Sequence, residues 1–130
     1  MPKILIVEDE QPNVEILSRL LERKNYEYSV AGNGQDAIAM AESIRPDLIL
    51  MDIGIPDIPG GAKNDTGGLE ATRQLKTSAA TRTIPIVALT AHAMLDDKKR
   101  FVAAGCDGVQ TKPYAFADLL GEIENRLRST

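Results

Sequence analysis

Short apolar stretches alternate along the chain with segments whose apolar residues recur every three or four positions. The apolar stretches span residues 4–7, 26–30, 48–51, 86–89 and, more weakly, 108–111. Their length and β-branched content predict strands. The segments between them have helical spacing, which is clearest in Val14, Leu17, Leu20 and Leu21, and in Phe116, Leu119, Leu120, Ile123 and Leu127. The pattern predicts five strands that alternate with helices.

Strand–helix alternation of this kind indicates right-handed βαβ units in an α/β fold. The strands are apolar enough to be covered on both faces, as in a parallel sheet. We therefore expect a doubly wound five-stranded parallel sheet, a flavodoxin-like (βα)5 architecture. The length of 130 residues suits a single domain spanning 1–130.

Composition narrows the possible functions. Hydrophobic residues make up 43% and charged residues 26%, which is typical of a soluble globular domain. A net charge of −4 argues against direct nucleic-acid binding, which needs a basic surface. A single cysteine, Cys106, and a single histidine, His92, supply neither a disulfide nor a structural zinc site. With no long apolar run, we expect a cytoplasmic protein without membrane insertion.

Acidic residues follow two of the expected strands. Glu8, Asp9 and Glu10 end the first, and Asp52 ends the third. Ligands of open parallel sheets bind outside the carboxyl ends of the strands, so these acids should converge. Each acid alone would be an ordinary surface charge, but the joint placement favours a site for a hard cation, Mg²⁺ with Mn²⁺ as a substitute.

Two further polar residues end the fourth and fifth expected strands. Thr90 supplies a hydroxyl and Lys112 an ammonium to the same edge. Taken singly, each would be an ordinary strand-end residue. Together with the acids they provide the groups needed for phosphoryl transfer to a carboxylate: a nucleophile, a cation site and positive charge. Asp52 would be the acceptor.

The sequence around these positions resembles the receiver domains of response regulators, the CheY-like superfamily. The resemblance lies in the runs ILIVEDE at 4–10, PDLILMDI at 46–53, PIVALTA at 85–91 and KP at 112–113. Shorter similarities occur at 33–37, 68–72 and 104–108, so the resemblance covers essentially the whole chain.

The resemblance implies a role for each site residue. Asp52 would be the phosphoacceptor, forming an aspartyl phosphate. Asp9 and Asp52 would bind Mg²⁺ directly with the Gly54 carbonyl, and Glu8 would assist through water.

Thr90 and Lys112 would bind the phosphoryl oxygens. The resemblance also suggests a cis peptide bond between Lys112 and Pro113, a state tolerated before proline.

A receiver domain implies two-component signal transduction or a phosphorelay. The phosphoryl donor would be a phosphohistidine of a sensor histidine kinase or a histidine phosphotransfer protein, and phosphorylation would change binding to a downstream protein target. Such a phosphoacceptor supports its own phosphotransfer and dephosphorylation without being an ordinary enzyme. We expect a monomer or weak dimer, resembling stand-alone regulators of the DivK type; the alternative is a receiver excised from a longer regulator or hybrid kinase.

Three features depart from the family pattern. Val109 stands where many receivers carry an aromatic switch residue, and Gly54 and His92 fill two variable positions beside the phosphoryl group. The third feature is a long loop at about 57–68, whose Gly, Pro, Asn and Asp residues fit neither the two-residue period of a strand nor the 3.6-residue period of a helix. It would bring Lys63, Asn64 and Asp65 near the site. The loop either gates the site or recognises a partner, or it is a tolerated surface insertion.

Two other functions share parts of this pattern. A flavin-binding flavodoxin would need a hydroxyl- and glycine-rich phosphate loop after the first strand, where Glu8, Asp9 and Glu10 would repel a phosphate. A haloacid-dehalogenase-type phosphatase would need a second aspartate where this chain has Gly54.

Overall fold

The computed structural model describes residues 1–63, 67–91 and 95–128. In this part of the chain, five parallel strands form one sheet in the order β2-β1-β3-β4-β5. The strands are β1 (Lys3–Val7), β2 (Glu27–Ala31), β3 (Leu48–Asp52), β4 (Ile86–Thr90) and β5 (Gly108–Thr111). The helices are α1 (Gln11–Arg23), α2 (Gly34–Ile44), α3 (Gly67–Thr77), α4 (Leu95–Ala104) and α5 (Phe116–Arg128). This confirms the predicted doubly wound parallel sheet.

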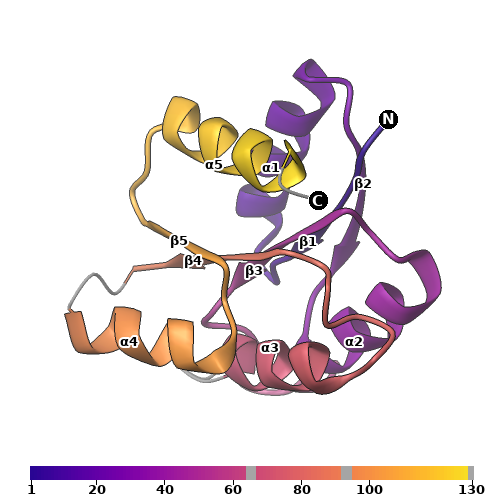
Figure 1. Ribbon diagram of the computed structural model, residues 1–130, viewed down its shortest axis with the longest axis vertical. Coiled ribbons are helices and arrows are strands. Elements are labelled where there is room, and N and C mark those ends of the chain that lie inside the picture. Colours follow the sequence, from indigo (N-terminus) through magenta and orange to yellow (C-terminus); the bar gives the residue numbers. More distant parts are fainter. Residues whose placement is uncertain (64–66, 92–94, 129–130) are drawn as a thin grey trace.

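Helices cover both faces of the sheet (Figure 1). In β1, Ile4 and Ile6 pack with α1 and α5, whereas Leu5 and Val7 pack with α2, α3 and α4. The same alternation in β3 and β4 produces two hydrophobic cores, one on each side of the sheet. Among the helices of the described residues, none is both long and apolar enough to cross a membrane.

The second strand begins one residue later than the apolar pattern predicts. The N–H of Tyr26 donates to the carbonyl of Leu21 and closes the end of α1, so the strand starts at Glu27. Because β2 is an edge strand, most of its residues are exposed or half-buried. The expectation that strands are covered on both faces therefore applies to β1, β3 and β4, and less to the two edge strands.

The connection between β3 and α3 is long, as predicted, but it ends earlier than expected. Helix α3 begins at Gly67, so the last two residues of the expected loop, Gly67 and Gly68, open the helix. A Cβ on Gly67 would lie 2.0 Å from the carbonyl oxygen of Ile55, which explains the need for glycine at this close approach. Asn64 and Asp65 lie outside the described residues.

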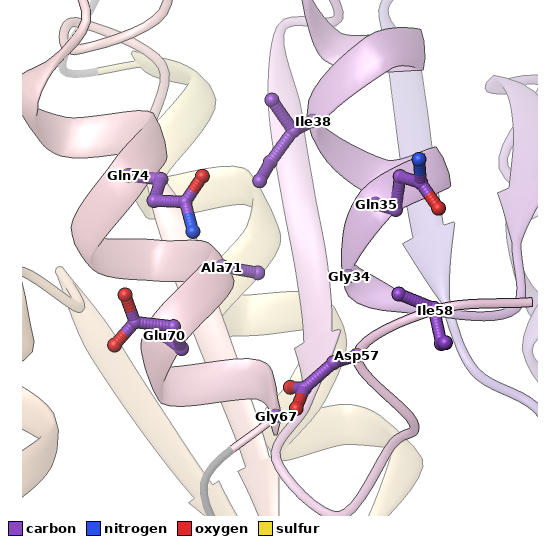
Figure 2. Close-up of a pocket in the computed structure, with 9 residues that line it drawn as sticks. All are labelled: Gly34, Gln35, Ile38, Asp57, Ile58, Gly67, Glu70, Ala71 and Gln74. Atoms are coloured by element: carbon purple, nitrogen blue, oxygen red, sulfur yellow. The ribbon is translucent and has the colours of Figure 1, made fainter. Parts of the chain in front are cut away.

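The first half of this loop borders a surface pocket between α2 and α3. Figure 2 shows Asp57 and Ile58 near the first residues of the two helices, Gly67 and Gly34, with Ile38 on α2 and Ala71 on α3 farther along the pocket. The loop is tied to α2 by its backbone, because the N–H of Gly34 donates to the Pro56 carbonyl and the N–H of Gln35 to the Asp57 carbonyl. The loop is therefore anchored on one side before it turns towards the sheet edge.

Candidate functional site

Three carboxylates meet at the carboxyl edge of the sheet. β1 and β3 are neighbouring strands in which Val7 lies opposite Met51. The next residues, Glu8 and Asp52, therefore lie side by side. Glu8, Asp9 and Asp52 each offer an oxygen within 4.8 Å of the others. The strand order reverses at β1, which is where a ligand site is expected in an open parallel sheet.

Glu8 is the most deeply buried of these acids, with 2% of its surface exposed. The N–H groups of Asp9 and Glu10 donate to its Oε2 at 3.0 and 3.3 Å. Burial, and to a smaller extent the neighbouring Asp52, together raise the pKa of Glu8 from 4.5 to about 7. The acid cluster is therefore costly to ionise completely in the absence of a cation.

Two oxygens of the cluster are buried and lack a hydrogen-bond partner among the described residues: Glu8 Oε1 and Asp9 Oδ1. Leaving such atoms unsatisfied is unfavourable. Converging carboxylate oxygens are the donor set that hard divalent cations prefer. The residues present therefore fit a Mg²⁺-type ion.

Asp52, the expected phosphoacceptor, is held from two sides. The N–H of Gly54 donates to its Oδ1 at 3.2 Å, and Lys112 Nζ lies 3.4 Å from its Oδ2. Lys112 Nζ also lies 3.8 Å from Glu8 Oε1. One ammonium thus partly compensates two carboxylates of the cluster.

Thr90 and Lys112 reach the site from adjacent strands. Thr90 is buried and lies opposite Thr111 in the β4–β5 register. The N–H of Lys112, one residue beyond β5, donates to the Thr90 carbonyl at 2.6 Å. The Lys112–Pro113 peptide bond is cis, which confirms that expectation.

These side chains line one hollow of about 190 Å³ at the sheet edge. Its lining residues are Glu10, Asp52, Ile53, Gly54, Lys63, Thr90, Ala91 and Lys112. The space is of the size needed for a phosphoryl group and its water rather than for a flavin. A cation, a carboxylate nucleophile, a hydroxyl and an ammonium can therefore meet here around one small anion.

Val109 and His92 are two of the positions at which the chain departs from the family pattern. Val109 is half-buried opposite Ala88 and packs against the core beneath α3 and α4. His92 lies outside the described residues.

The structure adds contacts that sequence reasoning did not assign. Lys63, in the loop between β3 and α3, forms ion pairs with Asp9 and Glu10. The sequence had predicted that Lys63 lies near the site, but not which residues it contacts. The close approach of Gly68 to the Asp52 backbone was not predicted, although its position at the end of a glycine-rich run was the available signal.

Comparisons with known proteins show which family the chain belongs to. The family described as the response regulator receiver domain matches residues 4–124. The polar-differentiation response regulator DivK of Brucella anthropi is 38% identical, over 98% of each chain. The receiver domain of a sensor histidine kinase from Pseudomonas aeruginosa, solved with a magnesium ion coordinated in its active site cleft, is 30% identical with a TM-score of 0.84, over 97% of each chain.

The chemotaxis protein CheY4 of Vibrio cholerae is 26% identical with a TM-score of 0.84, over 96% of this chain and 98% of that one. A likeness in both sequence and fold over nearly the full length sets aside the flavodoxin and haloacid-dehalogenase interpretations. The chain belongs to the response regulator receiver domain family, whose members accept phosphoryl groups in two-component signalling.

Proposed function

We propose that Asp52 accepts a phosphoryl group from a phosphohistidine of a sensor histidine kinase or a histidine phosphotransfer protein. The observation that carries this proposal is the contact between Asp52 and Lys112 at 3.4 Å, inside a hollow that Thr90 also lines. A carboxylate nucleophile beside fixed positive charge is the arrangement that phosphoryl transfer requires.

The cluster of Asp9, Asp52 and Glu8 would hold Mg²⁺, with Mn²⁺ as a substitute. Asp9 and Asp52 would ligate it directly together with the Gly54 carbonyl, and Glu8 would act through water. Glu8 and Asp9 each have a buried oxygen with no hydrogen-bond partner among the described residues, which supports this assignment, as does the magnesium ion of the Pseudomonas relative. When bound, the cation would neutralise negative charge on the phosphoryl oxygens.

In the transfer, one Asp52 carboxylate oxygen forms a bond to phosphorus while the phosphorus–nitrogen bond to the donor imidazole breaks. The electron pair of that bond stays on the imidazole, which leaves neutral when its other nitrogen carries a proton. Lys112 and the Thr90 hydroxyl would stabilise the oxygens that gain negative charge. Water would later attack the same phosphorus and lose a proton to solvent, the phosphorus–oxygen bond to Asp52 would break, and inorganic phosphate and the Asp52 carboxylate would result.

Phosphorylation would change the binding of a downstream protein target. The region after β4 is a suitable element for this change, because Thr90 connects the site to α4. We propose a cytoplasmic phosphoprotein that acts as a monomer or weak dimer and is not an enzyme with a separate substrate.

The experiment is Mg²⁺-dependent labelling by a small phosphodonor or a phosphorylated kinase. Asp52→Asn keeps the shape but removes the nucleophilic oxygen, and we expect it to abolish hydroxylamine-sensitive labelling. Asp57→Asn is the matched control, since it makes the same change on an exposed residue of the adjoining loop. Undiminished labelling of Asp52→Asn would assign the acceptor to another residue.

A further inference from the structure

Lys63 crosses from the β3–α3 loop to the acid cluster. Its Nζ lies 3.5 Å from Asp9 Oδ2 and 2.5 Å from Glu10 Oε1. Asp9 is one of the three acids that would hold the cation, and Lys63 lines the same hollow as Asp52. A cation of the protein itself thus occupies one side of the metal-binding cluster.

The loop backbone holds Lys63 in place. An antiparallel bridge pairs Lys63 with Pro56, and the N–H of Gly61 donates to the Ile58 carbonyl to close the turn between them. The Pro56 carbonyl in turn accepts a hydrogen bond from the N–H of Gly34 at the start of α2. The lysine therefore extends from an anchored turn, whose Ile58 also borders the pocket in Figure 2.

The two lysines of the hollow differ in how firmly they are held. The Lys112 side chain is 29% exposed and contacts Glu8 and Asp52, the deepest acids. The Lys63 side chain is 47% exposed and contacts the outer acids. An exposed ion pair contributes little free energy, and the flexible Lys63 side chain can move away from Asp9 without disturbing the core.

The oxygens of Asp9 are divided between two environments. Its Oδ2 faces Lys63, whereas Oδ1 is buried without a hydrogen-bond partner within the described ranges. A divalent ion bound through Asp9 would repel the ammonium at this distance, because two positive charges would share one carboxylate. Metal occupancy and the Asp9–Lys63 contact therefore oppose one another.

We propose that Lys63 is a positioning residue of the phosphorylation site, a tethered ammonium that pairs with Asp9 in the metal-free chain and competes with the divalent cation for it. This inference rests on the proposed function of the acid cluster. By linkage, a cation that displaces Lys63 also releases the β3–α3 loop from Asp9. The loop thus lowers the metal affinity of the site, which a neutral surface insertion would not do.

The test is direct measurement of Mg²⁺ affinity by isothermal titration calorimetry and of Mn²⁺ affinity by electron paramagnetic resonance, at low ionic strength and without a phosphodonor. We expect Lys63→Met to bind both ions about fivefold more tightly, the upper range for an exposed ion pair. Added salt should reduce this difference. Lys63→Arg keeps the charge and should bind at or below the wild-type affinity.

Lys24→Met is the matched control for the loss of one positive charge. Lys24 is exposed beyond the far end of α1, whose 13 residues span about 20 Å, so its removal should leave metal affinity within twofold. Equal or weaker binding by Lys63→Met, or the same gain in Lys24→Met, would overturn the inference. That failure is distinguishable from failure of the proposed function, because Asp52 labelling is measured separately and would remain normal.

A second readout follows the loop itself. In wild-type protein, Mg²⁺ should shift the amide resonances of Ile58, Gly61 and Lys63 as the ammonium leaves Asp9. In Lys63→Met the same amides should respond much less, while those of Glu8 and Asp9 still shift. Equal loop responses in the two proteins would contradict displacement of the lysine.

Discussion

Helix α3 rests on the backbone of Asp52 because residue 68 is glycine. A Cβ on Gly68 would lie 2.5 Å from the Asp52 carbonyl oxygen, a distance that side chains do not tolerate. The N–H of Gly68 donates to the Ile53 carbonyl at 3.0 Å. The start of the helix thereby fixes the strand end that presents the Asp52 carboxylate, the proposed acceptor.

Gly68→Ala should therefore affect both stability and the site. Overpacking against backbone of this kind destabilises by about 1 to 3 kcal/mol, and relief requires a shift of the Asp52 backbone. We expect a lower free energy of unfolding in urea and slower labelling by a phosphodonor. Gly121→Ala is the control: within the described residues, nothing beyond the adjoining backbone of α5 lies within 4 Å of its added Cβ, so α5 should gain stability. Wild-type behaviour of Gly68→Ala would contradict the close approach.

The raised pKa of Glu8 predicts an unusual pH dependence of stability without metal. The unfolded chain releases this proton near pH 4.5, whereas the folded chain retains it to about 7. The folded state therefore binds more protons between these values, so stability is lost as pH rises through this window. The contribution is at most about 3 kcal/mol.

Urea unfolding followed by circular dichroism between pH 4.5 and 8 measures this effect. Glu8→Gln, a neutral side chain of similar shape, should flatten the part of the profile between 4.5 and 7. Excess Mg²⁺ should oppose the loss in wild-type protein, because the folded acid cluster would hold the cation more tightly when its carboxylates are ionised. Identical profiles for wild type and Glu8→Gln would show that Glu8 titrates normally.

Lys112→Ala should impair phosphorylation while largely preserving the fold. Lys112 contributes charge beside Asp52 rather than core packing. Removing a donor that stabilises developing negative charge slows such reactions by about 100-fold. The rate of phosphotransfer from a phosphorylated kinase, with Lys24→Ala as the charge control, checks this. A wild-type rate would remove Lys112 from the mechanism.

The sequence predicted most of the fold and the site because both follow from local periodicity. Acids that directly follow apolar strands must meet at one edge of a parallel sheet, so Asp9 and Asp52 could be placed together without coordinates. The same reasoning placed Thr90 and Lys112. Only strand ends were needed, and these were correct to within one residue.

The loop could not be predicted in this way. Its Gly, Pro and Asn residues fit no period, so the reach of Lys63 to Asp9 depends on tertiary contacts such as the bridge to Pro56. The start of α3 was misplaced for the same reason. Gly67 and Gly68 are unfavourable in helices, and only their close approach to the backbone of Ile55 and Asp52, respectively, explains them there.

The last prediction concerns the output of phosphorylation. Val109 packs half-buried against the core, opposite Ala88, where many receivers carry an aromatic residue. A valine has no ring to swing between buried and exposed states, so its movement should be a small side-chain shift. The main change should lie after Thr90, in residues 92–97, because the Thr90 hydroxyl is drawn towards the new phosphoryl oxygens.

Amide hydrogen exchange or chemical shifts with Mg²⁺ and beryllofluoride, a phosphoryl mimic, provide the test. We expect changes at Thr90, across residues 92–97 and into α4, together with the metal-dependent response of the loop around Lys63. Mg²⁺ alone should produce the loop response without the α4 response, because the hydroxyl of Thr90 has no phosphoryl oxygen to follow. Changes confined to residues 56–68, with none between 90 and 97, would make the β3–α3 loop the output element instead. In that case partners would bind beside the α2–α3 pocket rather than at α4, and the displacement of Lys63 from Asp9 would itself carry the signal.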